Sequence, residues 1–344
     1  MRIHAYFSLF APPLTHVIHS SLQCPMMSSS EKPYVYQPLG FQTDLQALLE
    51  KNFNVVCSKE DVEKFRDKIV SIFVFLSPPV SDEMMSSFPN LKVIGNCAVG
   101  YEHVDLKACA RRGIRVGYTP GTLSDTTADM GWALLLAAAR RVLEGDKISR
   151  SPDTKKFDTS WYGLQVSGTT LGIIGMGRIG LEVAKRAAGF KMKVLYHNRN
   201  QVAREVEESV SATYMPTLTQ LLQESDHVVL VAPATKETYR MMGANEFSAM
   251  KTTATFVNVA RGTLVDHDAL TEALKSGTIA AAGLDVMDPE PLPRDHALLS
   301  LPNVIITPHT GSATLRTRMD MVQMSIDNVW AVLKGEPMVN EVKV

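Results

Sequence analysis

The chain has 344 residues, and 35 Lys plus Arg against 36 Asp plus Glu give a formal net charge of −1. This balance argues against a basic nucleic-acid-binding surface and against an acidic solvating tail. With 45% apolar and 21% charged residues, the composition is that of a globular protein, and the length suggests about two domains. No apolar run reaches the roughly 20 residues needed to cross a bilayer. We therefore expect a cytoplasmic protein that binds neither nucleic acid nor membrane.

The cysteines give no sign of a metal site or a disulfide framework. Cys24, Cys57, Cys97 and Cys109 form no C-x-x-C pair, and their spacing suits neither a zinc site nor a set of disulfides. The sequence therefore predicts reduced thiols and no bound metal.

Residues 1–32 differ from the rest of the chain. From Met1 to Ser30 there is no acidic residue, six serines occur, and Arg2 is the only Lys or Arg. We interpret residues 1–32 as an N-terminal extension. It can be a targeting segment, a disordered tail, or the product of a start upstream of Met26 or Met27. A mitochondrial transit peptide is acid-poor and Ser-rich, as this segment is, but it is also Arg-rich, which disfavours targeting.

From Pro33 onward, apolar strand candidates alternate with helical patterns. Strands are predicted at 34–37, 54–57, 69–76, 91–97 and 114–118, with helices at 43–51 and 61–67. Several of these strands are almost continuously apolar, as a parallel sheet covered on both faces requires. The first 90 or so residues after the extension therefore form one α/β unit.

A second alternating series follows a long helix predicted at 126–146, with Ser124 or Asp125 as its N-cap, and a polar arm at 149–163. Its strands are predicted at 170–174, 193–197, 227–231, 254–259, 280–286 and 304–307, before a last helix at 313–334. The pattern indicates two doubly wound α/β domains, Rossmann-like and flavodoxin-like, with the active site in the cleft between them. We assign 33–123 and 313–344 to a substrate (catalytic) domain, and 124–312 to a dinucleotide-binding domain.

A glycine-rich turn lies between the predicted strand 170–174 and a helix that begins at Arg178. Its sequence is Gly175-Met176-Gly177-Arg178-Ile179-Gly180. Gly175 allows the tight turn, Gly177 lets the backbone approach a pyrophosphate, and Gly180 lets helix and strand pack closely. Phosphate oxygens would meet free N–H groups at the helix N-terminus. The alternative is a plain strand–turn–helix that needs small residues.

The end of the next strand bears on the choice of cofactor. NAD enzymes usually carry Asp or Glu there, but this strand ends in His197-Asn198-Arg199-Asn200, without an acid. Arg199 can instead pair with a 2′-phosphate. The sequence thus favours NADPH over NADH, and the alternative is that Arg199 is a solvated surface charge.

Three ionisable residues follow predicted strands of the second series: Arg261, Glu290 and His309. Hydride transfer to a ketone leaves an alkoxide that needs a proton, which His309 can supply. Glu290 would favour the protonated form of His309, and Arg261 would hold a substrate carboxylate or polarise the carbonyl. Asp285 is a candidate for orienting a neighbour. Taken singly, each can also be an ordinary surface or turn residue.

These motifs together resemble the D-isomer-specific 2-hydroxyacid dehydrogenase family over residues 33 to 344. The resemblance rests on the glycine-rich turn and on Asn258-Val259-Ala260-Arg261-Gly262, Ala282-Gly283-Leu284-Asp285-Val286, Pro289-Glu290-Pro291 and Pro308-His309-Thr310-Gly311-Ser312. Within the family the chain is most similar to the glyoxylate/hydroxypyruvate reductase branch, through segments such as Arg115-Val116-Gly117-Tyr118-Thr119-Pro120 and Gly335-Glu336-Pro337-Met338.

The resemblance implies the same catalytic roles for Arg261, Glu290 and His309, and it adds binding residues. Val99 and Gly100 would hold the substrate carboxylate through backbone N–H groups. The cofactor would contact the glycine turn with Arg178 and Ile179, then Asn198 and Arg199, and at its nicotinamide end Ala232, Pro233, Val259, Asp285 and Gly311. The predicted long helix and the arm after it match the region through which the family forms homodimers.

Two segments depart from the family pattern. Trp161 lies near the place where a tryptophan of the mammalian-type reductase reaches the neighbouring subunit's active site, but the arm differs in composition. Tyr101-Glu102-His103 replaces the more usual Gly-x-Asp tract beyond the carboxylate-binding loop.

The leading hypothesis is an NADPH-dependent oxidoreductase that reduces glyoxylate or hydroxypyruvate to glycolate or D-glycerate. An alternative keeps the fold but changes the 2-oxo acid, for example to 2-ketogluconate or a phosphorylated acid. The phosphorylated acid is disfavoured because residues 96–105 contain no Lys or Arg. Another alternative is a non-enzymatic dinucleotide sensor that binds partners, although no nucleic-acid-binding patch is evident.

Overall fold

The computed structural model describes residues 32–75 and 78–343. The predictions for the N-terminal extension therefore concern residues outside this range, apart from Lys32, and so does the end of the predicted strand 69–76. None of the helices in the described part of the chain is long and apolar enough to cross a membrane. Cys57, Cys97 and Cys109 are free thiols, and the last two are buried.

The first sheet has five parallel strands in the order β2-β1-β3-β4-β5. The strands are β1 (Tyr34–Tyr36), β2 (Asn54–Val56), β3 (Ile69–Val74), β4 (Val93–Asn96) and β5 (Arg115–Gly117). This is the flavodoxin-like order. All five strands were predicted from the sequence, although each is shorter than its apolar run. The buried run continues past the last paired residue, as at Cys97 and Ala98 after β4.

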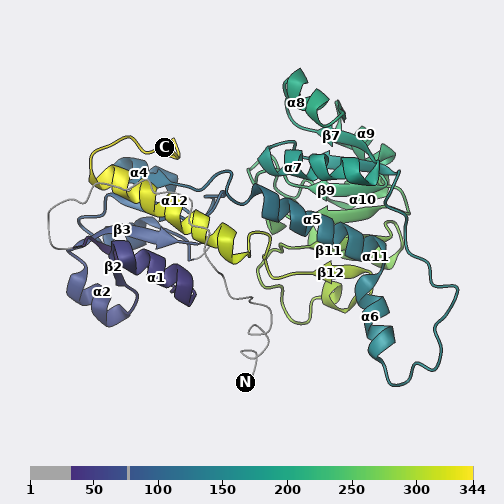
Figure 1. The fold of residues 1–344 in the computed structure, drawn as a ribbon, viewed down its shortest axis with the longest axis horizontal. Helices are drawn as coiled ribbons and strands as arrows, with labels where there is room; N and C mark the ends of the chain where they lie inside the picture. Colours follow the sequence, from purple (N-terminus) through teal and green to yellow (C-terminus); the bar gives the residue numbers. More distant parts are fainter. Residues whose placement is uncertain (1–31, 76–77, 344) are drawn as a thin grey trace, which may run out of the picture. The chain divides into compact units, whose positions relative to one another are not determined.

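Helices cover both faces of this sheet, which explains its continuous apolar strands. They are α1 (Thr43–Asn52), α2 (Lys59–Phe65), α3 (Asp82–Ser86), α4 (Leu106–Arg112) and α12 (Leu315–Leu333). The last helix of the chain, α12, packs against α1 and β4 (Figure 1). A Cβ on Gly95 of β4 would lie 2.8 Å from the Ser325 hydroxyl and 3.1 Å from Val329. The C-terminal helix therefore completes the core of the N-terminal sheet.

The predicted helix at 126–146 is wrong in its extent and in its cap. The structure has α5 (Ser124–Ala139) and a separate α6 (Val142–Arg150), and Leu123 precedes α5 without a side-chain cap. Arg141 separates the helices in the left-handed conformation, with φ of 54°. Its guanidinium pairs with Glu144 at 2.7 Å and stacks 3.7 Å from the centre of the Trp161 ring. The break between the helices thus involves contacts with the later arm, and the apolar periodicity of the helix itself does not predict such contacts.

The second sheet has seven parallel strands in the order β12-β11-β10-β9-β6-β7-β8. The strands are β6 (Thr170–Ile174), β7 (Lys193–His197), β8 (Ala212–Tyr214), β9 (His227–Leu230), β10 (Thr255–Asn258), β11 (Ala281–Leu284) and β12 (Val304–Ile306). The sequence missed β8, an edge strand without a fully buried residue. The order in which the chain adds strands to the sheet reverses at β6, which pairs with β7 on one side and with β9 on the other. Such a switch point forms a crevice at the carboxyl ends of the strands. The two parallel sheets confirm the predicted α/β fold class.

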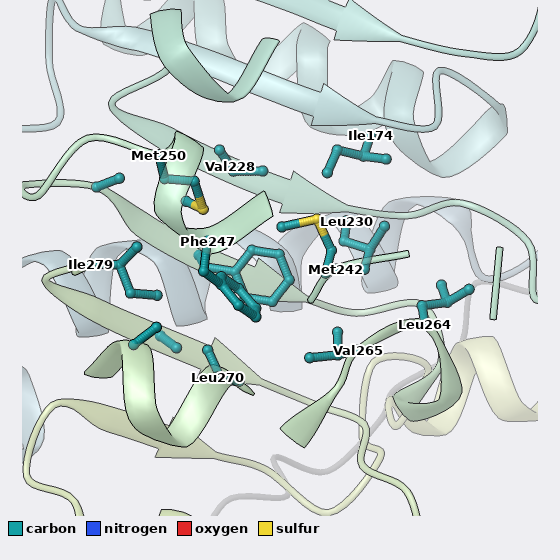
Figure 2. Packing of buried hydrophobic residues seen from close by; sticks show 14 of the residues in the cluster. Ile174, Val228, Leu230, Met242, Phe247, Met250, Leu264, Val265, Leu270 and Ile279 are labelled. Atoms are coloured by element: carbon teal, nitrogen blue, oxygen red, sulfur yellow. The ribbon is translucent and has the colours of Figure 1, made fainter. Parts of the chain in front are cut away.

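Apolar helix faces pack on both sides of this sheet. The helices that follow its strands are α7 (Arg178–Ala187), α8 (Arg204–Ser209), α9 (Leu218–Glu224), α10 (Ala244–Ala249) and α11 (His267–Lys275). Figure 2 shows one side, where Phe247 of α10 lies among Val228, Leu230 and Leu270. The Phe247 ring meets Phe256 edge-on, with centroids 5.4 Å apart. The rigid sheet fixes the loops at its carboxyl edge.

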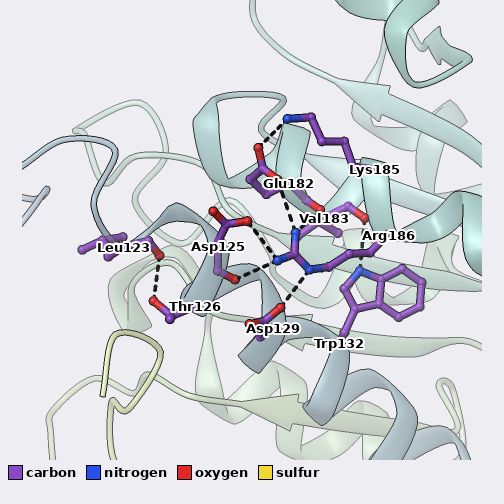
Figure 3. A network of polar contacts seen from close by, with 9 residues as sticks. All are labelled: Leu123, Asp125, Thr126, Asp129, Trp132, Glu182, Val183, Lys185 and Arg186. Carbon is purple, nitrogen blue, oxygen red and sulfur yellow. Dashed lines mark hydrogen bonds and ion pairs between the residues drawn. The ribbon is translucent and has the colours of Figure 1, made fainter. Parts of the chain in front are cut away.

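On the other side, α5 packs against α7, β10 and β11. Arg186 of α7 donates to Asp125 and Asp129 of α5 and to Glu182 of its own helix, and the Trp132 indole donates to the Val183 carbonyl at 3.1 Å (Figure 3). These contacts connect α5 to α7, the helix that begins at the glycine-rich turn.

Candidate active site

A cavity of about 780 Å³ lies at the carboxyl ends of strands from both sheets. From the five-stranded sheet it is lined by Phe75 after β3, the segment after β4 and Tyr118 after β5. From the seven-stranded sheet it is lined by segments that follow β6, β9, β10, β11 and β12. This is the edge where ligands of open parallel sheets bind.

The cavity brings together most of the residues singled out in the sequence. Lining it are Val99, Gly100, Gly177, Arg178, Ile179, Ala232, Pro233, Val259, Arg261, Asp285, His309 and Gly311. Five others do not line it: Gly175, Gly180, Asn198, Arg199 and Glu290. Of these five, Glu290, Gly175, Gly180 and Asn198 contact or shape the segments that do line the cavity.

The glycine-rich turn after β6 is shaped by close backbone packing. Gly175 has φ of +107°, which side-chain-bearing residues rarely adopt. A Cβ on Gly180 would lie 2.1 Å from the Gly175 carbonyl oxygen, whereas a Cβ on Gly177 would meet nothing within 4 Å. The Asn198 side-chain oxygen accepts a hydrogen bond from the Met176 N–H at 2.7 Å. Asn198 therefore fixes the turn rather than pointing into the cavity.

The start of α7 has the features of an anion site. Gly177 precedes the helix without a side-chain cap, its first turn contains no acidic residue, and Lys185 and Arg186 lie in its last turn. The N–H groups of a helix's first turn carry partial positive charge and bind phosphate. This arrangement fits the pyrophosphate of a dinucleotide, which the open space beside Gly177 would admit.

Arg199 is exposed in the turn that follows β7. Its charge contributes to lowering the pKa of Glu237, on the loop after β9, although the hydrogen bond between Glu237 and Thr235 has the larger effect. Arg199 therefore lies close enough to the loop after β9 for its positive charge to influence that loop. This loop is next to the switch point, where the ribose 2′-substituent of a dinucleotide is expected.

Arg261 lies in a turn held by the side chain of Asn258, for which no role was predicted. Asn258, the last residue of β10, donates to the Arg261 carbonyl at 2.9 Å and accepts from the Ala260 N–H at 3.0 Å. A Cβ on Gly262 would lie 1.9 Å from the Met287 carbonyl carbon, so glycine is required where this turn meets the segment after β11. Asn258 and Gly262 both belong to the family motif at 258–262, but only the packing shows why asparagine and glycine are needed there.

His309 and Glu290 form a hydrogen-bonded pair at the cavity. His309 Nδ1 lies 2.9 Å from Glu290 Oε2, and Glu290 Oε1 accepts from the Met287 N–H at 2.9 Å. Burial raises the pKa of Glu290, but the hydrogen bonds with His309 and Met287 outweigh it and hold that pKa below its usual value. Glu290 is therefore a carboxylate that orients the ring, and Nε2 is the ring nitrogen left for proton transfer.

Buried Asp285 organises the segment that carries His309. Its carboxylate accepts from the Thr307 hydroxyl at 2.6 Å and from the N–H groups of Thr310 and Gly311 at 2.8 and 2.7 Å. The Asp285 carbonyl accepts from the His309 N–H at 2.8 Å. His309 has φ of 53°, a conformation that costs a non-glycine residue about 1 kcal/mol or more and that surrounding contacts must maintain. Asp285 supplies these contacts.

Arg261 has an ionic partner within the cavity, Glu102, which was not predicted from the sequence. Its Nε donates to Glu102 Oε1, and its Nη1 donates to the Ala260 carbonyl at 2.7 Å. Glu102 follows Val99 and Gly100, and a Cβ on Gly100 would lie 2.0 Å from Arg261 Nη2. The sequence showed that Glu102 departs from the family pattern, but not that its carboxylate reaches Arg261.

Comparison with known proteins identifies the family. Residues 132–311 match the model of the D-isomer specific 2-hydroxyacid dehydrogenase NAD binding domain. A glyoxylate reductase of Thermococcus gammatolerans is 46% identical over 318 residues, 89% of this chain and 94% of the relative. A glyoxylate/hydroxypyruvate reductase B of an Enterobacter species is 42% identical over 88% of this chain and 96% of its own length.

Solved structures agree with this assignment. An NADPH-dependent glyoxylate/hydroxypyruvate reductase of Sinorhizobium meliloti, in complex with NADP and malonate, superposes with a TM-score of 0.80 at 32% identity. The match covers 91% of this chain and 97% of the other. A Thermus thermophilus protein superposes with a TM-score of 0.82 at 41% identity, over 90% of this chain and all of the other. The chain belongs to the D-isomer specific 2-hydroxyacid dehydrogenase family and is an NAD(P)-dependent dehydrogenase.

Proposed function

We propose that this enzyme reduces glyoxylate and hydroxypyruvate to glycolate and D-glycerate, with NADPH as the hydride donor. The observation that carries the proposal is that His309, which is hydrogen-bonded to Glu290 at 2.9 Å, lines the same cavity as Arg261 and Gly177 of the glycine turn. The names of the relatives in Thermococcus, Enterobacter and Sinorhizobium support this choice of substrate.

In the proposed mechanism, the substrate carboxylate binds the backbone of Val99 and Gly100 next to the guanidinium of Arg261. A nicotinamide dinucleotide held at Gly177, Arg178 and Ile179 would supply the hydride that the carbonyl carbon accepts. Arg261 stabilises the negative charge that develops on the carbonyl oxygen, because preorganised donors act strongly in a site shielded from water. His309 donates the proton of Nε2 to that oxygen, while Nδ1–H stays bonded to Glu290.

A panel of 2-oxo acids tests the substrate. We expect NADPH oxidation, followed at 340 nm, to show the highest kcat/KM with glyoxylate and hydroxypyruvate. 2-Ketogluconate and phosphohydroxypyruvate should be poorer substrates, and chiral analysis should find D-glycerate. Failure of the correctly folded enzyme to turn over any of these acids would refute the proposal.

The cofactor proposal rests on Arg199 and on the lack of an acid after β7. Arg199→Leu should raise the KM for NADPH about tenfold and leave the KM for NADH almost unchanged, because only NADPH carries the 2′-phosphate. Arg204→Leu is the matched control, since Arg204 is an exposed cation on α8 that pairs with Glu208. Equal effects of the two substitutions, or a preference of the unmodified enzyme for NADH, would contradict the assignment.

We also propose that residues 33–123 and 313–344 form the substrate domain, that 124–312 form the dinucleotide-binding domain, and that the enzyme is a cytoplasmic homodimer. The family-model match at 132–311 supports the second domain. Exposed apolar side chains on α6 and the following arm, including Leu143 and Tyr162, support the dimer. Sedimentation analysis of the purified chain tests it, and a monomer at micromolar concentration would exclude it.

A further inference from the structure

We propose that Glu102 limits the site to 2-oxo acids that carry a single negative charge. The inference rests on the proposed function, in which Arg261 receives the substrate carboxylate. It assigns Glu102 a role in selecting among 2-oxo acids by charge, before any contact with the rest of the substrate.

The first observation is that Glu102 already accepts a hydrogen bond from the guanidinium of Arg261. Glu102 Oε1 accepts from Nε, and the Ala260 carbonyl accepts from Nη1. Nη2 lies against Gly100, the residue expected to contact the substrate carboxylate. An incoming anion therefore meets the Nη2 end of an arginine whose positive charge is already matched.

The second observation is that the Glu102 carboxyl forms an ion pair with Arg261 at the cavity, which favours its negatively charged form. Burial raises the pKa of the Glu102 carboxyl. The charge of Arg261 and the hydrogen bond from Arg261 outweigh this effect and hold the pKa below its usual value. The Glu102 side chain is 41% exposed, and the residue lines the cavity. Its negative charge therefore acts on whatever binds there.

A count of charges shows the consequence for binding. When His309 is protonated for transfer, Arg261 and His309 contribute two positive charges, and Glu102 and Glu290 contribute two negative ones, so the sum is zero. A 2-oxo monocarboxylate brings this sum to −1, and a dicarboxylate brings it to −2. Each added negative charge is costly in a partly dehydrated site.

The other charged groups around the cavity do not change this balance. Asp105 and Lys107, both exposed, line it with opposite signs. Buried Asp285 interacts electrostatically with Arg318 of α12. Arg178 lies at the start of α7, where the dinucleotide phosphates are expected. The charge facing the substrate is therefore set by Arg261 and His309 together with Glu102 and Glu290.

The experiment compares Glu102→Gln with the unmodified full-length enzyme. It measures kcat/KM for NADPH-dependent reduction of oxaloacetate, a dianion, and of glyoxylate, a monoanion. We expect the ratio of the two values, oxaloacetate over glyoxylate, to rise about tenfold in Glu102→Gln. Glu102→Asp retains the charge on a side chain one methylene shorter, and its ratio should stay within about threefold of the original. Glu83→Gln, at an exposed acid on α3, is the matched control and should leave the ratio unchanged.

A binding measurement separates this inference from the proposed function. Calorimetry of the enzyme with NADP⁺ measures the Kd of malonate, a dianion, and of oxamate, an unreactive monoanion. In Glu102→Gln the Kd of malonate should fall about tenfold relative to the Kd of oxamate. This result can be obtained even if the enzyme reduces none of the proposed acids. Unchanged ratios in both experiments would overturn the inference. A comparable loss of affinity for both anions would also overturn it, because Glu102 would then position Arg261 rather than select by charge.

Discussion

Two turns at the same edge of the seven-stranded sheet are built by different means. The turn after β6 depends on the absence of side chains: Gly175 adopts a positive φ, and Gly180 lies against the Gly175 carbonyl. The segment after β12 depends on side chains, because the Asp285 carboxylate and Glu290 hold His309 and its neighbours. The first turn leaves room for a ligand, and the second fixes a reactive group.

This difference decides how substitutions should act on the two turns. A backbone-built anion site fails when an atom is added to it, and the loss appears in cofactor binding. A side-chain-built proton donor fails when a group is removed, and the loss appears in the rate of the chemical step. Kinetic and binding measurements on matched variants can therefore separate the two turns.

His309→Gln should have the largest effect on catalysis. Glutamine cannot supply the proton, so we expect kcat to fall about 10³-fold while the Kd for NADPH, measured by fluorescence, changes less than about threefold. Thermal unfolding serves as the control for folding. A variant that retains its kcat would remove His309 from the mechanism and end the distinction between the two turns.

Asp285→Asn should have the next largest effect, through the position of His309. One amide NH₂ of the asparagine would face an N–H of Thr310 or Gly311, where the carboxylate now accepts hydrogen bonds. We expect kcat to fall about 10²-fold and the free energy of unfolding to fall by about 2 kcal/mol. Asp295→Asn, at an exposed position on the same connecting segment, is the control. Native kcat in Asp285→Asn would show that the segment holds His309 without this carboxylate.

The same contrast explains what the sequence could predict. The glycine turn was recognised because its requirements lie within six consecutive residues after an apolar strand. Arg261, Glu290 and His309 were selected as candidates because each follows a predicted strand and matches a family motif. The roles of Asn258 and Gly262, the left-handed Arg141 between α5 and α6, and the pairing of Glu102 with Arg261 were missed. Each depends on packing or on a partner that local patterns do not specify.

Two alanine substitutions sharpen the account of the glycine turn. Gly177→Ala adds a methyl group to open space, so stability should be unchanged while the Kd for NADPH rises about tenfold, because the methyl group occupies the approach of the pyrophosphate. Gly180→Ala forces a Cβ against the Gly175 carbonyl and should lower the free energy of unfolding by about 1–3 kcal/mol. Denaturant unfolding and cofactor titration measure both effects. Equal destabilisation by the two substitutions would show that the turn does not tolerate extra volume at either position.

Arg186→Met should have the smallest effect, although Arg186 makes the most ionic contacts in Figure 3. The substitution removes its bonds to Asp125, Asp129 and Glu182, at 3.0, 2.8 and 3.3 Å, but keeps an apolar stem. Because the Asp125 and Asp129 carboxylates are largely solvated, at 73% and 63% exposure, we expect the free energy of unfolding to fall by about 1 kcal/mol, and by less in 1 M salt. The Kd for NADPH should not change, since Val183, Ala184 and Ala187 still pack α7 into the core. A weaker Kd at unchanged stability would instead mean that the ion pairs, and not the apolar face of α7, set the position of the helix start that receives the pyrophosphate.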